Sequence, residues 1–382
     1  MHPWIFASAL VALLLTGCDG GGPLFNALDV EVAATDGSGN PTEILITDLG
    51  AEWFTCSQPQ GSKIIRVDLA GNILWEFDQY GDVLNGAHNA DLNATEDQMI
   101  ISDYCNDRVL VIDHPEGNII WESSVDCPEL TLNGPNDANF LGGGISQGNI
   151  LITVQDDHWV LEVDPSLCNG VPDDGEIVWS FGAQGAPRAP EDIDDPDRLR
   201  FPHNADSLPN GNVIIADAAK AFTDEGRVIE IDYASKRIAW IYRANPDCII
   251  KGIPDIWCPG LNWARDADVE CEDPACTRGT VVVTGIHQSV GVLRDLTEPP
   301  PPGESIPRGR EVVFQVQHPQ GFCYDTDFVP RWDDDDNEGL GFFLVSNQGP
   351  SLLGNWVLTV PVDVSFSETN NVWQLYGSPS AP

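Results

Sequence analysis

Four-residue motifs that open with a polar side chain recur along the chain. Two of them read His-Asn-Ala-Asp, at 88–91 and 203–206, and three variants of the pattern stand at 136–139, 265–268 and 324–327. The third position is always small and the fourth is always Asp or Asn. The first position varies and is always polar, being His88, Asn136, His203, Arg265 and Tyr324.

These first-position side chains could support chemistry on a negatively charged group. A neutral imidazole can act as a base or nucleophile, and a guanidinium or protonated imidazole can stabilise developing negative charge. We therefore expect His203, His88 and Arg265 to be catalytic and Tyr324 and Asn136 to bind the substrate. The alternative is that each His only bonds a neighbouring backbone carbonyl. A transfer through an imidazole needs no metal or other cofactor, and the expected ligand is a small aryl or anionic molecule.

The motifs belong to longer repeats that end on a large aromatic residue. Short β-rich runs such as "NVIIAD" and "RVIEID" precede "RIAWIY", and Gly, Pro and Asn turn signals separate the runs. Six units share this order, and their aromatic residues are Trp75, Trp121, Trp179, Trp240, Phe314 and Trp373. Recurrence in every unit favours packing between units for these rings.

Units of this length with three or four strands predict an all-β fold, a six-bladed β-propeller of four-stranded blades over residues 27–377. The first unit begins near "ALDVEVAAT" and shows no motif of the His-Asn-Ala-Asp kind. If innermost strands begin at the mouth of the central channel, the first-position side chains form a ring there. We interpret the fourth-position Asp and Asn residues as acceptors for backbone N–H groups in turns.

Two further segments carry candidate residues. His287, in "TGIHQSVGV", could reach the channel and is a further catalytic candidate. In "RWDDDDNEG" the carboxylates of Asp334, Asp336 and Glu338 alternate before a glycine, as in a calcium loop, but the downstream bidentate Glu is missing. A solvated insertion is the alternative to this weak calcium site, and no other metal is expected.

The N-terminal sequence predicts export. An apolar run from Trp4 to Leu15 ends in Leu-Thr-Gly-Cys, which is typical of a lipoprotein signal peptide over residues 1–17 with Cys18 as the lipidated residue. Residues 18–26 would form a short linker. No Lys or Arg precedes the run, and plain secretion is the alternative. We expect the protein in the periplasm or on the cell surface, with a lipid anchor through Cys18.

The charge balance excludes two classes of partner. The chain has 60 Asp plus Glu against 18 Lys plus Arg, a formal net charge of −42. Such a surface repels phosphate backbones and anionic headgroups, so neither nucleic acid nor electrostatic membrane docking is expected.

Cysteine usage is consistent with export. Ten cysteines in an exported chain favour disulfides. Cys248, Cys258, Cys271 and Cys276 lie close together in the sequence and predict local disulfides, with a zinc cluster as the alternative. The sequence fixes neither the connectivity nor the oligomeric state.

Taken together, "HNADSLPNGNVIIAD", "RVIEID", "RIAWIY" and "IHQSVGV" resemble the bacterial arylsulfotransferase family. The resemblance implies a six-bladed periplasmic propeller that moves a sulfuryl group from an aryl sulfate to a phenol through a histidine intermediate, without a nucleotide donor. Where the family has a nucleophilic His near its last motif, this chain has Tyr324-Asp325-Thr326. Either His203 or His88 takes that role, or the propeller binds a ligand or partner without turnover, with calcium stabilisation as a further possibility.

Overall fold

The computed structural model describes residues 12–13, 27–37, 41–49, 56, 61–68, 72–78, 83–171, 175–189, 191–219, 226–243, 249–250, 263–285, 288–300, 305–309, 311–317, 322–331, 339–348 and 356–364. Within these ranges the chain is almost entirely strand and turn. Helical structure is limited there to α1 (Ser123–Asp126) and two 3-10 helices, η1 (Tyr104–Asn106) and η2 (Pro165–Leu167). None of the described helices has the length and apolar character needed to cross a bilayer.

The described strands form six sheets. Four of these are simple antiparallel meanders whose strands follow each other in sequence order. They comprise β2 (Ala27–Thr35), β3 (Pro41–Asp48), β4 (Lys63–Asp68) and β5 (Ile73–Phe77); β6 (Ala87–Leu92), β7 (Gln98–Asp103), β8 (Arg108–Asp113) and β9 (Ile119–Glu122); β10 (Pro135–Phe140), β11 (Ile150–Val154), β12 (Trp159–Val163) and β13 (Ile177–Gly182); and β14 (Pro202–Ser207), β15 (Val213–Asp217), β16 (Arg227–Asp232) and β17 (Arg237–Arg243).

The remaining two sheets depart from this pattern at their outer edges. The fifth contains β19 (Asp266–Cys271), β20 (Arg278–Gly285), β21 (Gln288–Asp295) and β22 (Glu311–Gln317), and β18 (Ile249–Ile250) adds to it in parallel with β22. The sixth contains β23 (Phe322–Arg331), β24 (Gly339–Gln348) and β25 (Trp356–Val364). Its fourth strand is β1 (Ala12–Leu13), which pairs antiparallel with β25.

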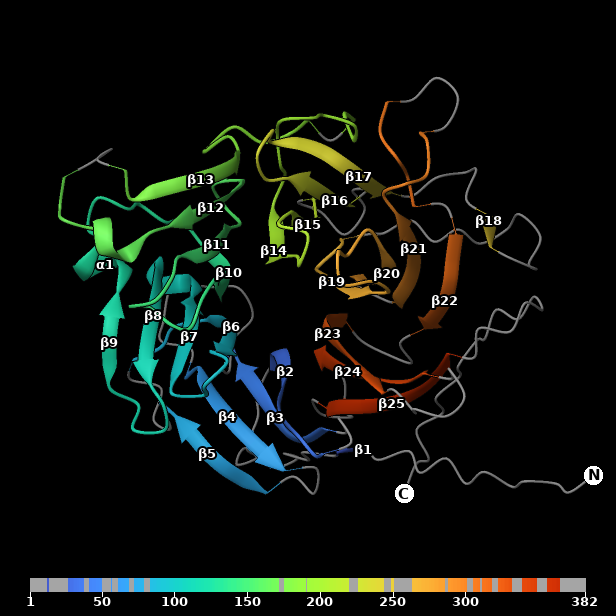
Figure 1. Cartoon of the computed structure of the whole chain (residues 1–382). Helices are drawn as coiled ribbons and strands as arrows, with labels where there is room; N and C mark the ends of the chain where they lie inside the picture. Colours follow the sequence, from blue (N-terminus) through green and yellow to red (C-terminus); the bar gives the residue numbers. More distant parts are fainter. Residues whose placement is uncertain are drawn as a thin grey trace, which may run out of the picture.

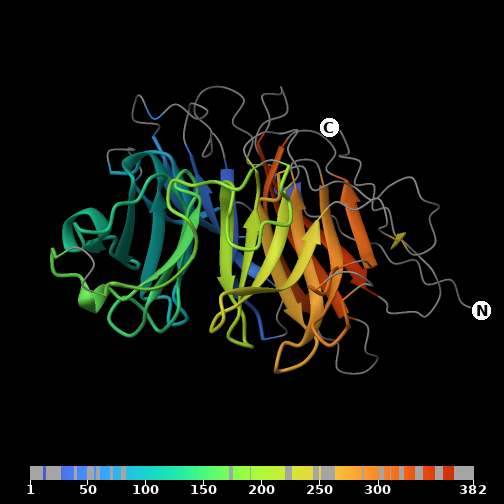
Figure 2. The same ribbon diagram turned by 90° about the horizontal axis from the view of Figure 1, so that it is seen from above.

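The sheets are arranged around a common axis (Figure 1). The innermost strands contact one another in the order β2, β6, β10, β14, β19 and β23, and β23 contacts β2 again. Turned by 90°, the molecule shows its strands running between two opposite faces of this ring (Figure 2). The architecture is an all-β propeller with a central channel lined by the first strand of each sheet.

The prediction of six blades with four strands each is correct for five of the described sheets. The sheet of β19 to β22 has five strands because the two residues of β18 extend its outer edge. In the last sheet the predicted outer strand at 370–376 lies outside the described residues, and β1, within the predicted signal peptide, occupies the edge instead.

Buried β-branched and aliphatic residues fill the spaces between neighbouring sheets. Trp121, Trp179 and Trp240 are buried, and each belongs to a cluster that combines residues of two adjacent sheets. The indole nitrogens of Trp75 and Trp179 donate to backbone carbonyls of the following sheet, at Pro115 and Tyr233, over 2.8 and 2.9 Å. The predicted packing role is confirmed for Trp75, Trp121, Trp179 and Trp240, the four of these aromatics whose side chains are described.

Three disulfides lie among the described residues. Cys56 pairs with Cys105, Cys127 with Cys168, and Cys271 with Cys276. The last pair confirms one local disulfide in the predicted cysteine-rich segment and removes these two thiols from any zinc cluster. Cys248 and Cys258 fall outside the described residues.

Candidate functional site

A β-bulge at the start of the inner strands determines which side chains face the channel. The pairing of β6 with β7 skips His88, that of β10 with β11 skips Asn136, and that of β14 with β15 skips His203. In a regular strand neighbouring side chains point to opposite faces, whereas a bulge re-aims one of them. The first and second motif positions therefore both line the channel.

One end of the channel is a chamber that collects the first-position side chains. His88, Asn136, His203 and Arg265 line this cavity of about 40 Å³, together with the second-position residues of their strands. We call it the donor chamber. Since a buried water needs ~10–15 Å³, the donor chamber has room for about three waters or for one small oxyanion.

The first sheet contributes to the donor chamber as well. Leu28 and Asp29 line it, and the pairing of β2 with β3 shifts register between Ala27 and Asp29, as happens at the start of β6, β10 and β14. Leu28-Asp29-Val30-Glu31 therefore occupies the place of the motif in this sheet. As expected for the first unit, it does not fit the motif, because its first residue is apolar, its third is Val and its fourth is Glu.

The second-position side chains tie each inner strand to the next. Oδ2 of Asp29 accepts the Ala90 N–H at 3.1 Å, Oδ1 of Asn89 accepts the Ala138 N–H at 3.4 Å, and Oδ2 of Asp137 accepts the Ala205 N–H at 3.0 Å. Inner strands of different sheets do not form a backbone ladder, so these N–H groups need side-chain acceptors. The second position thus supplies acceptors for strand N–H groups, a role that the sequence analysis did not assign to it.

This series is interrupted between the fourth and fifth sheets. The Ala267 N–H bonds to Oδ1 of its own neighbour Asp266, at 2.8 Å, and not to Asn204. Within the described part of the chain, Oδ1 of Asn204 and Nε2 of His203 have no hydrogen-bond partner. The interruption thus lies beside His203 and Arg265, and leaves polar atoms of Asn204 and His203 available to a ligand.

His88 is held by polar and aromatic neighbours. Its Nδ1 lies 3.1 Å from Nδ2 of Asn136, which also donates to Oε1 of Gln155. This assignment makes Nδ1 the acceptor, so that Nε2 carries the proton of the neutral ring. The ring packs on Tyr104 with 4.5 Å between centroids. Burial, and then the charge of Arg265, lower the pKa of His88 to about 3.

His203 and Arg265 share one aromatic neighbour. The Trp263 indole lies 4.3 Å from Cζ of Arg265 and meets the His203 ring edge-on at 5.7 Å between centroids. Arg265 is 2% exposed and His203 5% exposed. Burial, and then the Arg265 charge, hold the pKa of His203 well below its usual value. The donor chamber therefore combines one fixed positive charge and two neutral imidazoles with the carboxylates of Asp29, Asp137 and Asp266.

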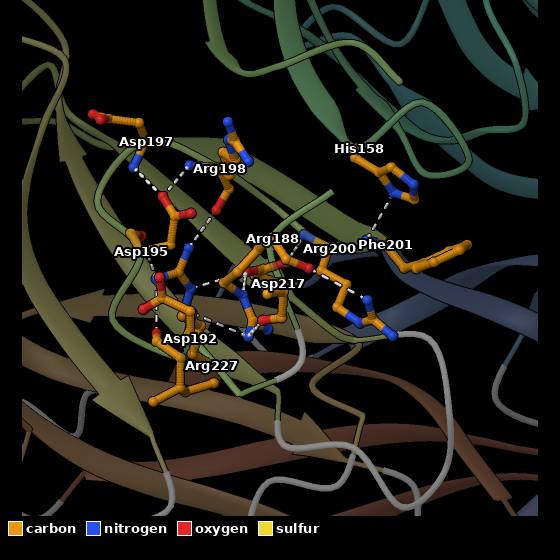
Figure 3. Close-up of polar contacts among 12 residues, drawn as sticks. His158, Arg188, Asp192, Asp195, Asp197, Arg198, Arg200, Phe201, Asp217 and Arg227 are labelled. Atoms are coloured by element: carbon orange, nitrogen blue, oxygen red, sulfur yellow. Dashed lines mark hydrogen bonds and ion pairs between the residues drawn. The ribbon is translucent and has the colours of Figure 1, made fainter. Parts of the chain in front are cut away.

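The start of β14 is anchored by a buried ion-pair cluster around Asp217 (Figure 3). Oδ2 of Asp217 accepts from Nε of Arg188 at 3.2 Å and from Nε of Arg227 at 2.8 Å, and Oδ1 accepts the Arg200 N–H at 2.6 Å. Nδ1 of His158 accepts the Phe201 N–H at 3.2 Å. These bonds fix the backbone immediately before His203.

The opposite end of the channel is acidic. A second cavity of about 120 Å³ is lined by Asn side chains and carboxylates from the inner strands β2, β6, β10, β14 and β19. Its lining is Asp29, Glu31, Asn89, Asp91, Asp137, Asn139, Asn204, Asp206, Asp266 and Asp268. Asp29, Asp137 and Asp266 line both cavities, and four further carboxylates line only the second, so the end of the channel away from Arg265 is the less favourable one for an anion.

The structure brings four of the predicted site residues together and leaves the others outside the described part. His88, Asn136, His203 and Arg265 share the donor chamber. Tyr324 belongs to β23, where its side chain lies outside the described residues, as do His287, Cys18 and the Asp334, Asp336 and Glu338 loop.

One group of described residues has the spacing of a metal site, Cys127, Glu129 and Cys168. The two cysteines are joined in a disulfide, and their sulfurs are not thiolate ligands in that form.

Sequence reasoning missed two features of the site that carried a sequence signal. The second motif position is Asn or Asp in every unit, which indicates a shared hydrogen-bonding role. The second feature is the cluster of Arg188 and Arg227 on Asp217, from which they lie 29 and 10 residues away in the sequence. Its sequence signal is an Asp at the end of a strand, since Asp217 ends β15 as Asp103 ends β7.

No protein-family model and no curated protein matches the chain. Among solved structures, the β-propeller domain of Cps50 (Swd1) from Myceliophteria thermophila is similar over 88% of this chain and 97% of that chain, with 10% identity and a TM-score of 0.45. The WD40 domain of coronin from Toxoplasma gondii matches 91% of this chain and 86% of its own, with 10% identity and a TM-score of 0.45. Scores this low carry no argument about activity.

Proposed function

We propose that the protein binds a small oxyanion group, such as the sulfate end of an aryl sulfate, in the donor chamber. The observation that carries the proposal is the convergence of Arg265, His203 and His88 on one cavity. Arg265 supplies a permanent charge, and His88 supplies an N–H donor through Nε2. Charge-assisted hydrogen bonds of this kind are the strong ones in binding sites.

The size of the donor chamber limits which part of the ligand enters it. About 40 Å³ accommodates the oxyanion group and not an attached aromatic ring. The second, acidic cavity disfavours deeper entry of a negative charge. We therefore infer that an aryl group extends away from the acidic end, towards the loops that precede the inner strands.

The binding proposal is tested by calorimetric titration of the purified protein with sulfate and with phenyl sulfate. A hydrogen bond to a charged group contributes about 1.5–3 kcal/mol, so Arg265→Met is expected to weaken binding by about 10- to 150-fold. Arg237→Met is the matched control, because Arg237 is exposed on the outer strand β17. Equal affinity in the wild type and in Arg265→Met contradicts the proposal.

A second candidate function is sulfuryl transfer. It is favoured by His203, whose neutral ring has an Nε2 without a partner among the described residues. In this reaction Nε2 attacks sulfur, an N–S bond forms as the S–O bond to the donor phenol breaks, and the phenolate leaves with the bonding electrons. An acceptor phenol then takes the sulfuryl group from nitrogen, and its proton passes to the released phenolate.

Transfer is distinguished from simple binding by release of 4-nitrophenol from 4-nitrophenyl sulfate in the presence of phenol. An active wild type and an inactive His203→Ala variant support transfer. A wild type that binds phenyl sulfate and releases no nitrophenol leaves binding as the function.

A location outside the cytoplasm is also part of the proposal. The three disulfides among the described residues are compatible with an oxidising compartment. A lipid on Cys18 predicts that the wild type sediments with membranes and that a Cys18→Ser variant does not. Sedimentation of both proteins with membranes contradicts the anchor.

A further inference from the structure

The residue two places before the first motif position adopts a left-handed backbone in four neighbouring sheets. In two of these sheets it is glycine, Gly86 with φ of +69° and Gly134 with φ of +63°. In the other two it is aromatic, Phe201 with φ of +56° and Trp263 with φ of +59°. Glycine adopts this conformation without strain, whereas a bulky side chain does so at a cost.

The strained aromatic at 263 makes contacts that a glycine there could not make. Its indole is 9% exposed and packs on Ala218 of the preceding sheet. The guanidinium carbon of Arg265 lies 4.3 Å from the ring centroid, within the range of a cation–π interaction. The His203 ring contacts the indole from another side. A strained backbone conformation persists where the surrounding contacts of the residue stabilise it, and such residues cluster at functional sites.

We propose that Trp263 is a positioning residue, which holds the Arg265 guanidinium against its indole face and thereby aims the guanidinium N–H groups into the donor chamber. A guanidinium stacked on an aromatic face still donates hydrogen bonds in its own plane. The effect on ligand affinity rests on the proposed function, while the placement of Arg265 is independent of it.

Phe201 provides the matched comparison. It occupies the equivalent position on the neighbouring sheet with nearly the same φ. Its ring packs on His158, with 4.5 Å between centroids. The same substitution at 201 and 263 therefore changes the strand start in a similar way, and only the change at 263 removes a ring from Arg265.

The binding test compares Trp263→Leu, Trp263→Phe and Phe201→Leu by calorimetric titration with sulfate. Leucine keeps an apolar side chain and lacks a π face, so Trp263→Leu is expected to weaken sulfate binding by about 3- to 30-fold. Trp263→Phe should retain most of the affinity, and Phe201→Leu should change it by less than about twofold. Equal losses in Trp263→Leu and Phe201→Leu overturn the proposal, because the loss then reflects a loosened strand start.

A spectroscopic test follows the two imidazoles by NMR titration. The Arg265 charge contributes to the lowered pKa of His88 and His203. If Trp263→Leu lets the guanidinium move away, the pKa of both rings rises towards the ordinary value. An unchanged pKa of His88 in Trp263→Leu overturns the proposal. The His88 ring packs on Tyr104, so its pKa reports the position of the Arg265 charge, whereas the pKa of His203, whose ring contacts Trp263, also responds to the loss of burial.

A measurement on the wild type covers the case in which Trp263→Leu does not fold. Side-chain protons of Arg265 that lie over the indole face should resonate upfield of ordinary arginine protons, owing to the ring current. Ordinary shifts overturn the placement. If the wild type binds no sulfate, the oxyanion function fails, and the histidine titration and the Arg265 shifts still decide the role of Trp263.

Discussion

Replacing Asp217 by Asn tests whether the buried cluster before β14 holds the site in place. Asp217, Arg188 and Arg227 are each 0% exposed, so the two guanidiniums lose their shared counter-charge inside the protein. The Asn side chain can still accept the Arg200 N–H through its amide oxygen. The change therefore removes the charge and leaves the shape of the side chain.

The expected cost follows from these two ion pairs. Removing one partner of a buried pair costs about 3–5 kcal/mol, because the other charge stays buried without compensation. Arg227 keeps its bonds to the carbonyls of Ile193, Asp195 and Arg198, which places the cost towards the lower end. At about 2 °C per kcal/mol for a large domain, the midpoint of thermal unfolding should fall by about 6–8 °C at pH 7.

The assay is thermal unfolding followed by circular dichroism. Asp194→Asn is the matched control, because Asp194 is 51% exposed and pairs with Arg243 at the surface, where an ion pair is worth at most about 1 kcal/mol. Combining Asp217→Asn with Arg188→Met should restore part of the loss, since one stranded charge is then absent. A shift below about 2 °C for Asp217→Asn alone would refute the reasoning.

Three further predictions concern the channel and its surroundings. Burial and the charge of Arg265 lower the pKa of His88 to about 3 in the folded state, so the unfolded chain binds more protons than the folded one below about pH 6.5. The free energy of unfolding should therefore fall between pH 6.5 and pH 3. Melting curves of His88→Gln should show a fall that is shallower by up to about 1.4 kcal/mol per pH unit. Gly86→Ala should destabilise by more than about 1 kcal/mol in urea unfolding, since φ is +69° and the new Cβ would lie 2.7 Å from Sγ of Cys105. Replacing Cys56 and Cys105 by Ser opens a link between residues 49 positions apart and should cost about 4 kcal/mol in the same assay, whereas reduction of the wild type, which also opens the other two disulfides, should cost more.

The repeat pattern was sufficient to predict the propeller and its inter-sheet packing. Trp121, Trp179 and Trp240 recur at one place in each unit, and the same space between sheets has to be filled each time. Because the same packing position recurs in each unit, the same residue type recurs there, and the scaffold can therefore be predicted from a single sequence.

Which motif positions face the channel could not be predicted from the repeat pattern. Strict alternation puts the first and third positions on one face and the second and fourth on the other. The bulges at His88, Asn136 and His203 break this rule and turn both His203 and Asn204 towards the axis. A bulge depends on pairing with the next strand, so the motif alone does not reveal it.

The outer edges of the last two sheets involve contacts between distant parts of the chain. β18 joins β22 across more than 60 residues, and β1 joins β25 from the opposite end of the sequence. Both edge strands have two residues and carry no periodicity of their own. Tertiary contacts create such strands, and local sequence does not specify them.

The central claim is that Arg265, His203 and His88 together bind one oxyanion in the channel. A crystal soaked in selenate tests it most directly, because selenium can be located by its anomalous scattering. We expect one peak in the donor chamber, within hydrogen-bond distance of Arg265 and His203, and no such peak in Arg265→Met crystals. A wild-type donor chamber without selenium, or a peak that persists in Arg265→Met, would contradict the account.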